Sequence, residues 1–271
     1  MLPGKIFGLF YMYGLMISIG ILLALSLLFY YGKKKKVEES FMDFFFYNGI
    51  FSIAFGFFSA TLFQSVYNYL ENPSAGFHFG GMTFIGGVIG GVVCFIGVYF
   101  LLRKRYKTRL FQVQSFAPCA IVIAHGFGRL GCLFAGCCHG AETDAWYGIY
   151  MQTASFGYAK VVPIQLFEAL FLFAMFAVMF YLLMKKDFKY NFSVYLIVYG
   201  VWRFIIEFFR DDHRGEFVKG LTPSQFWAIV MVVAGVAVFF YVKYLFKRQA
   251  EKEAVMAQQL PATEETKEEQ V

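Results

Sequence analysis

Seven long apolar runs occupy most of the sequence and limit the folds that are open to it. They cover approximately residues 8–31, 42–64, 83–102, 115–135, 164–184, 191–209 and 223–246. A helix needs roughly 20 residues to cross the hydrocarbon core of a bilayer. Because backbone polar groups cannot stay unpaired in hydrocarbon, and because these runs are continuous rather than alternating, helices are favoured over a barrel. The sequence therefore predicts an all-α polytopic membrane protein with seven transmembrane helices.

The composition excludes several other classes of protein. Of the 271 residues, 59% are apolar and only 15% are charged, whereas a soluble domain is about a quarter charged. Such a chain cannot cover itself with polar surface in water, so a soluble enzyme and a disordered chain are excluded. Five cysteines cannot all pair internally, which argues against a disulfide-stapled domain. The net charge of +6 comes from basic residues placed between the apolar runs, so it does not indicate nucleic-acid binding, and no nucleic-acid partner is expected.

The placement of basic residues predicts the orientation in the membrane. If the N-terminus is outside, the inner loops and the C-terminal tail hold 17 of the 24 Lys and Arg residues, and the outer segments hold five. This alternation fits the positive-inside rule and favours an odd number of spans. We expect a membrane protein whose C-terminus lies in the cytoplasm, with one seven-helix transmembrane domain over residues 1–249. Residues 250–271 are expected to form a disordered, charged cytoplasmic tail.

Charged residues inside two of the runs, and the polar residues beside them, are the best functional candidates, because each charged residue costs about 2.5–3.5 kcal/mol to insert. In the fourth run, His125 and Arg129 are four residues apart and share a helix face. In the sixth, Tyr199, Arg203 and Glu207 form a stripe with the same spacing. A buried Arg–Glu pair that only fixes helix packing is the alternative interpretation.

Two arginines on separate helices favour an anion site over a purely structural pair. One carboxylate, Glu207, cannot neutralise both Arg129 and Arg203, so a spare positive charge is expected. A lipid phosphate is the anion available at that depth, and the guanidinium fork matches phosphate oxygens. A transporter or an ion pathway is a weaker hypothesis, because the chain lacks internal repeats.

The glycines of the third run allow two interpretations. Gly86 and Gly90, and likewise Gly87 and Gly91, are spaced for close helix packing. Alternatively, backbone N–H groups near Gly86 and Gly87 approach a ligand.

Three cysteines follow the fourth run. Cys132, Cys137, Cys138 and His139 have the residue types of a zinc site. The spacing matches no zinc-finger pattern, and neighbouring cysteines rarely bind one ion together. We therefore expect structural or unpaired thiols, no metal ion and no cofactor.

Gln165 and Glu168 lie in the first turn of the fifth run, after Pro163. A carboxylate there suits the helix dipole, so a simple cap is one interpretation and ligand binding is the other. Pro223 marks the start of the seventh helix.

Four blocks in order resemble the prolipoprotein diacylglyceryl transferase family. They are Tyr13-Gly14-Leu15-Met16, Gly80-Gly81-Met82-Thr83-Phe84-Ile85-Gly86-Gly87, Gly128-Arg129-Leu130-Gly131 and Tyr199-x3-Arg203-x3-Glu207. Pro163-x-Gln165-Leu-Phe-Glu168 and Leu221-Thr222-Pro223-Ser224-Gln225 also match the general pattern of the family. The resemblance extends from about residue 8 to residue 246.

The resemblance implies a reaction and its partners. Members of the family transfer a diacylglyceryl group from phosphatidylglycerol to the lipobox cysteine thiol in the signal peptide of a lipoprotein precursor, and they release glycerol 1-phosphate. By this resemblance Arg129 and Arg203 bind the phosphate, and Glu207 orients Arg203. The resemblance also implies seven residues that bind substrate: Tyr13, Tyr199, Gly86, Gly87, Gly131, Gln165 and Glu168.

Four departures from the family pattern concern the thiol and headgroup side of the reaction. Ile85 stands where the family has a histidine, and two amides and one carboxylate are replaced after Arg129, with Cys132 and Cys137 among the substitutes. His125 is then the best replacement base, and His139 is second. A divergent transferase that uses the same phosphate pocket with another donor or acceptor is the alternative.

Overall fold

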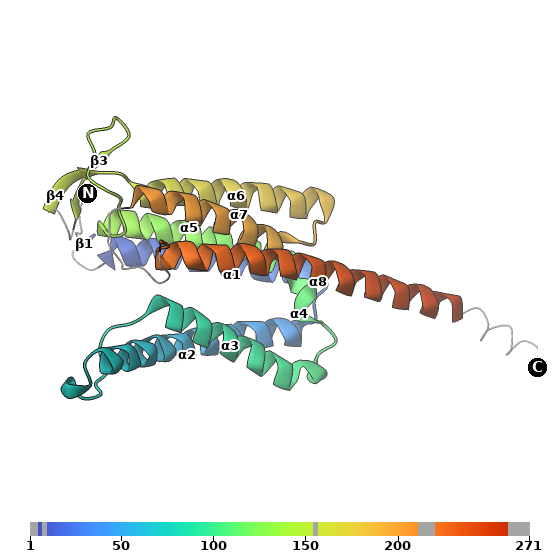
Figure 1. Cartoon of the computed structure of the whole chain (residues 1–271). Helices are drawn as coiled ribbons and strands as arrows, with labels where there is room; N and C mark the ends of the chain where they lie inside the picture. Colours follow the sequence, from blue (N-terminus) through green and yellow to red (C-terminus); the bar gives the residue numbers. More distant parts are fainter. Residues whose placement is uncertain (1–4, 7–9, 154–156, 211–219, 260–271) are drawn as a thin grey trace, which may run out of the picture. The chain divides into compact units, whose positions relative to one another are not determined.

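The computed structural model describes residues 5–6, 10–153, 157–210 and 220–259, and seven of its helices are long and apolar enough to cross a membrane (Figure 1). These helices are α1 (Met12–Lys34), α2 (Glu39–Glu71), α3 (Phe84–Leu102), α5 (Ala117–Ala135), α6 (Ile164–Lys186), α7 (Asn191–Ile206) and α8 (Pro223–Gln259). Short elements lie between them: α4 (Leu110–Val113) and the 3-10 turns η1 (Pro73–Ala75), η2 (Arg103–Arg105) and η3 (Glu207–Phe209). The prediction of an all-α polytopic membrane protein is confirmed, and each span overlaps its predicted run.

The chain divides into two compact units, one formed by residues 1–28 and 111–271 and the other by residues 29–110. The second unit is the antiparallel pair of α2 and α3. Its glycines face α2: a Cβ on Gly86 would lie 2.6 Å from the Cβ of Phe63, and one on Gly90 would overlap the side chain of Ser59. Ser59 Oγ donates to the carbonyl of Gly86 at 2.9 Å. Close helix packing therefore explains these glycines in the structure.

The first unit is built around α5, α6 and α7. Gly126 of α5 lies against Phe173 of α6, where a Cβ would come within 2.7 Å of the ring. Gly200 of α7 lies equally close to Val232 of α8. These close approaches bring polar groups on three helices within hydrogen-bonding reach of one another.

The residue pattern between the fourth and fifth runs predicts a long loop over residues 141–162, and the structure has a β-hairpin there. Strand β3 (Ile149–Thr153) pairs antiparallel with β4 (Gly157–Val161). Met151 and Val161 are fully buried and pack against Leu133 near the end of α5. The hairpin therefore fixes the chain around the C-terminal end of α5. A smaller antiparallel pair joins β1 (Lys5–Ile6) and β2 (Phe10–Tyr11).

Helix α8 continues into the predicted tail. Residues 250–259 are helical, although the sequence predicted disorder from residue 250. Pairs one turn apart support this extension: Lys247 Nζ lies 3.9 Å from Glu251 Oε1, and Gln249 Nε2 donates to Glu253 Oε1 at 2.8 Å. Residues 260–271 lie outside the described part of the chain, and the domain boundary at residue 249 stays a prediction.

Candidate functional site

An ion pair between two helices lies at the centre of the first unit. Arg129 Nη2 of α5 lies 3.0 Å from Glu168 Oε1 of α6. The Tyr199 hydroxyl of α7 donates to the same oxygen at 2.6 Å. The Glu168 side chain is fully buried and that of Arg129 is 18% exposed. One carboxylate thus joins polar groups from three spans.

His125 lies one turn before Arg129 on α5, between two tyrosines of α7. Its Nε2 is 3.4 Å from the Tyr199 hydroxyl, and its Nδ1 is 3.4 Å from the Tyr195 hydroxyl. The imidazole also packs edge-on against the Tyr199 ring, with ring centroids 4.8 Å apart. Both ring nitrogens face hydroxyl groups, and Tyr199 connects the imidazole to Glu168.

A second ion pair lies at the end of α7. Arg203 Nη2 is 2.8 Å from Glu207 Oε2 and donates to Ser224 Oγ at 3.0 Å. Thr222 Oγ1 donates to the other carboxylate oxygen of Glu207 at 3.2 Å. Arg210 lies on the other side of Glu207, with its Nε 3.9 Å from the carboxylate.

The start of α8 is fixed by a reciprocal cap. Thr222 N donates to Gln225 Oε1 at 3.1 Å, and Gln225 N donates to Thr222 Oγ1 at 3.2 Å. The prediction that a helix starts at Pro223 is confirmed. Because this cap holds Thr222 and Ser224 in place, both hydroxyls reach the Arg203–Glu207 pair.

The structure corrects the count of charges made from the sequence. We expected Glu207 alone to face both arginines, but Arg129 has its own carboxylate in Glu168. The sequence could not reveal this partner, because α5 and α6 meet only through tertiary packing. Arg210 also joins the cluster, with its side chain 3% exposed. The five groups Arg129, Arg203, Arg210, Glu168 and Glu207 still leave one positive charge in excess.

Two buried guanidinium nitrogens have no hydrogen-bond partner among the described residues. They are Arg129 Nε on α5 and Arg203 Nη1 on α7. A buried donor without a partner costs about 1–3 kcal/mol, and more when it is charged. Such groups in a native structure call for a ligand, ion or water that satisfies them. We identify these two nitrogens as the donors of the candidate anion site.

Gln165 and Glu168 do not cap α6, so the capping interpretation is wrong. No side-chain hydrogen bond is made at the N-cap, Pro163. Gln165 Nε2 instead donates to the carbonyl of Cys137 at 2.7 Å. Gln165 therefore fixes the chain after α5, while Glu168 holds Arg129.

Tyr13 lies beside α5. A Cβ on Gly131 would be 3.2 Å from the ring of Tyr13, so the glycine leaves room for this tyrosine. The substrate-binding roles of Tyr13 and Gly131 remain predictions, as do those of Gly86 and Gly87 in the second unit. Asp211, Asp212 and His213, which were expected as solvated loop residues, lie outside the described residues.

The three cysteines after Arg129 converge. The Sγ atoms of Cys132, Cys137 and Cys138 all lie within 4.8 Å of one another. Gly136 ends α5 with φ 68°, and Cys138 has φ 62°, which is rare for a residue with a side chain. This backbone conformation costs about 1–3 kcal/mol at a non-glycine residue. Cys137 N donates to the carbonyl of Cys132 at 3.2 Å and closes the turn.

Hydrogen bonding within the cysteine cluster favours ionisation of one thiol. Bonds with Cys132 and Cys137 hold the pKa of the Cys138 thiol well below its ordinary value. The guanidinium groups of Arg129 and Arg210 act in the same direction. His139, the second candidate base, instead faces its neighbour, with Nδ1 2.8 Å from the carbonyl of Gly140.

Three residues of this cluster were not predicted as site residues: Tyr195, Arg210 and Thr222. Tyr195 lies four residues before Tyr199 and continues the α7 stripe, so the same spacing could have identified it. Arg210 lies three residues after Glu207, within reach on a helical turn. Thr222 stood out only as part of the family-like block before α8, and its contact with Glu207 depends on how α8 packs beside α7.

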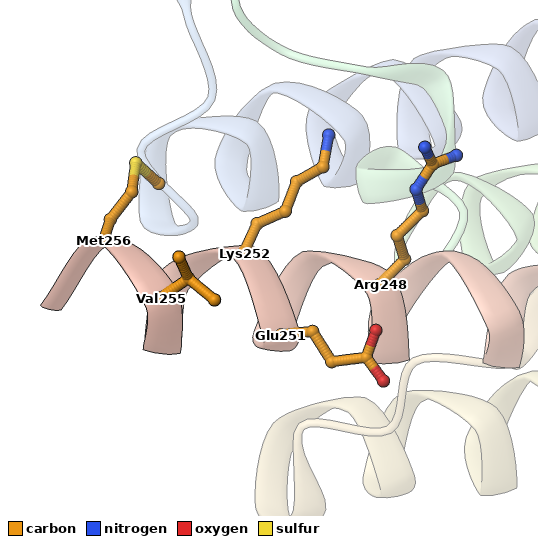
Figure 2. Close-up of a pocket in the computed structure, with 5 residues that line it drawn as sticks. All are labelled: Arg248, Glu251, Lys252, Val255 and Met256. Atoms are coloured by element: carbon orange, nitrogen blue, oxygen red, sulfur yellow. The ribbon is translucent and has the colours of Figure 1, made fainter. Parts of the chain in front are cut away.

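A shallow depression elsewhere does not belong to this site. Figure 2 shows that it is lined by residues of α8 alone, with Arg248 and Lys252 on one side of the helix and Glu251 on the other. Its lining residues are Arg248, Glu251, Lys252, Val255 and Met256. They lie in the charged extension of α8, where one face is open, so we assign no ligand to it.

The fold and the buried charges define a class: a polytopic membrane protein with paired charged residues inside its helical bundle. Comparison with known proteins gives the family. The family described as prolipoprotein diacylglyceryl transferase matches residues 5–241, and the chain belongs to it.

Similar curated proteins extend over nearly the whole chain. The phosphatidylglycerol–prolipoprotein diacylglyceryl transferase of Clostridium tetani is 34% identical over 243 residues, which cover 87% of this chain and 94% of that protein. Transferase 2 of Clostridium perfringens is 33% identical over 245 residues, with 87% and 93% covered. The transferase of Francisella tularensis subsp. novicida is 32% identical over 241 residues, with 85% and 88% covered.

Removal of the Glu168 charge is expected to destabilise the bundle. Glu168→Gln leaves the Arg129 guanidinium buried without a counter-charge, and such a loss costs about 3–5 kcal/mol. We expect a clearly lower unfolding midpoint in detergent. Glu251→Gln is the matched control, because its pair with Lys247 is exposed and contributes no more than about 1 kcal/mol. Equal midpoints for the two variants would contradict a structural role for the Arg129–Glu168 pair.

Proposed function

We propose that this protein transfers a diacylglyceryl group from phosphatidylglycerol to the cysteine thiol of lipoprotein precursors and releases glycerol 1-phosphate. One observation carries the proposal: Arg129 and Arg203, on separate spans, each keep one buried N–H donor without a partner among the described residues. Membership of the family supports the same reaction. A phosphodiester headgroup supplies the anionic oxygens that such donors bind.

In this proposal the two carboxylates hold the arginines and leave donors for the substrate. Glu168 engages Nη2 of Arg129, so its Nε remains for the phosphate. Glu207 and Ser224 engage Nη2 of Arg203, so its Nη1 remains. Fixed donors cost little reorganisation as charge develops on the leaving phosphate, and this is the main source of catalysis in such sites.

The transfer itself is a displacement at carbon. The thiolate sulfur of the acceptor attacks the glyceryl carbon, the C–O bond to phosphate breaks, and its electron pair stays on the phosphate. Arg129 and Arg203 stabilise that charge. We assign His125 as the group that accepts the thiol proton, and Glu207 as the group that orients Arg203. Tyr199 and Tyr13 bind glycerol or headgroup oxygens, and Gln165 supports the chain beside the site.

We also propose an orientation in the membrane, a cellular location and an acceptor for this protein. The positive-inside rule puts the N-terminus outside and the C-terminus in the cytoplasm of a bacterial cell, so the membrane is the inner one. The acceptor is the signal-peptide region of the precursor. The cluster lies toward the C-terminal end of α5, which this orientation places near the outer leaflet.

Arg203→Lys tests the phosphate role directly. Lys keeps the charge but lacks the fork, so it cannot contact Glu207, Ser224 and a phosphate oxygen together. In phosphatidylglycerol vesicles with a lipobox peptide, we expect the diacylglyceryl mass shift to form about 100-fold more slowly, with the unfolding midpoint preserved. Arg248→Lys on the extension of α8 is the matched control and keeps the parental rate. Parental activity in Arg203→Lys would overturn the phosphate role, and no mass shift with the folded parent protein would overturn the reaction.

His125→Gln tests the proton acceptor. Gln can hydrogen-bond to Tyr199 and Tyr195 but cannot take up a proton, so transfer should slow by about 100-fold. The rate should also lose the dependence on pH that the imidazole gives it. His78→Gln provides the control, because His78 is exposed and lies in the other unit. An unchanged rate across pH in His125→Gln would remove His125 from the mechanism.

A further inference from the structure

The cysteine cluster lies beside the arginines and has no role in the mechanism above. Cys132 follows Arg129 by three residues on α5, so the two side chains share a helix face. Cys138 interacts electrostatically with both Arg129 and Arg210. All three cysteines are free and partly exposed. The cluster can therefore be reached from outside the bundle and borders the site where the phosphate is proposed to bind.

The backbone removes the objection to two neighbouring cysteines as joint ligands. Adjacent side chains normally point apart, but the positive φ angles of Gly136 and Cys138 turn the chain back on the end of α5. A Cβ on Gly136 would collide with the carbonyl oxygen of Gln152 in β3, so only glycine fits this turn. Gln165 holds the Cys137 carbonyl from α6. Three elements thus hold the thiols together.

The geometry suits a zinc ion. Zinc binds thiolate sulfur at about 2.3 Å, so sulfurs in a tetrahedral site lie about 3.8 Å apart. The three Sγ atoms need only a small adjustment to reach that spacing, because none is more than 4.8 Å from another. Three thiolates and one zinc ion carry a single negative charge.

We propose that Cys132, Cys137 and Cys138 bind one zinc ion through three thiolates, and that the open fourth position takes the acceptor thiol of the transfer reaction. Three protein ligands with one open position are the pattern of catalytic zinc sites, whereas structural sites have four protein ligands. The acceptor part of this inference rests on the proposed function; the metal part does not.

Zinc would supply what the reaction needs on its thiol side. A free thiol has a pKa of about 8.5 and is mostly protonated at neutral pH. A thiol bound to zinc is deprotonated, and the thiolate is the nucleophile. The acceptor thiol gives up its proton to the base proposed above, His125. The sulfur then forms the bond to the glyceryl carbon as the C–O bond breaks, and the electron pair of that bond leaves with the phosphate.

The metal part is tested on the full-length protein in detergent by elemental analysis. We expect one zinc ion per chain, and after chelation and reconstitution with Co²⁺ we expect a thiolate-to-cobalt charge-transfer band. The triple variant Cys132→Ser, Cys137→Ser, Cys138→Ser should lose both signals. Cys94→Ser, in the other unit, should keep them. Absence of zinc and cobalt binding in the parent, or equal binding in the triple variant, would overturn the site; so would a disulfide within the cluster of the freshly purified protein.

The acceptor part is tested by adding a lipobox peptide to the cobalt form. A cysteine peptide should change the charge-transfer band, and the same peptide with serine at that position should not. An unchanged spectrum with the cysteine peptide would overturn the fourth-ligand role. Full transfer activity after complete chelation would overturn the inference while the proposed function stands. A cobalt site that responds to the peptide, in a parent protein without transfer activity, would support the site and reject the proposed function.

Discussion

The contact between Arg129 and Glu168 determines how the rest of the bundle can be arranged. A guanidinium group inside a membrane must be paired, and here its counter-charge is fully buried on a neighbouring span. Tyr199 donates to the same carboxylate oxygen from a third span. Since an unpaired charge would be costly in this environment, α5, α6 and α7 keep one relative position. The same contact uses Nη2 of Arg129 and leaves its Nε without a partner among the described residues.

Length, hydropathy and the placement of Lys and Arg were enough to predict seven spans, because each of these properties acts within a single segment. The hairpin β3–β4 could not be predicted, since Met151 and Val161 are ordered by packing against Leu133 of α5. Helix α8 also extends past the predicted end of its span. The additional turns mix charged and polar residues with small or apolar ones, and pairs one turn apart support them.

The candidate site was also predictable only in part, namely where its residues lie on one helix. Arg203 and Glu207 lie on one helix four residues apart, so their pairing follows from the spacing alone. Glu168 as the partner of Arg129 depends on packing between helices and was missed. The convergence of Cys132, Cys137 and Cys138 depends on a positive φ at a cysteine, for which the sequence carries no signal. Contacts between residues of one helix can therefore be predicted from their spacing in the sequence, whereas contacts between different elements require the structure.

The central claim is that Arg129 and Arg203 hold the same phosphate, and a double-mutant cycle tests it most directly. Phosphatidylglycerol binding would be measured in neutral-lipid nanodiscs for the parent protein, Arg129→Lys, Arg203→Lys and the double variant. Two donors on one phosphate predict that the losses in binding free energy depart from additivity by about 0.5–3 kcal/mol. Losses that add within experimental error would mean that the two arginines act at separate places, and this result would contradict the account.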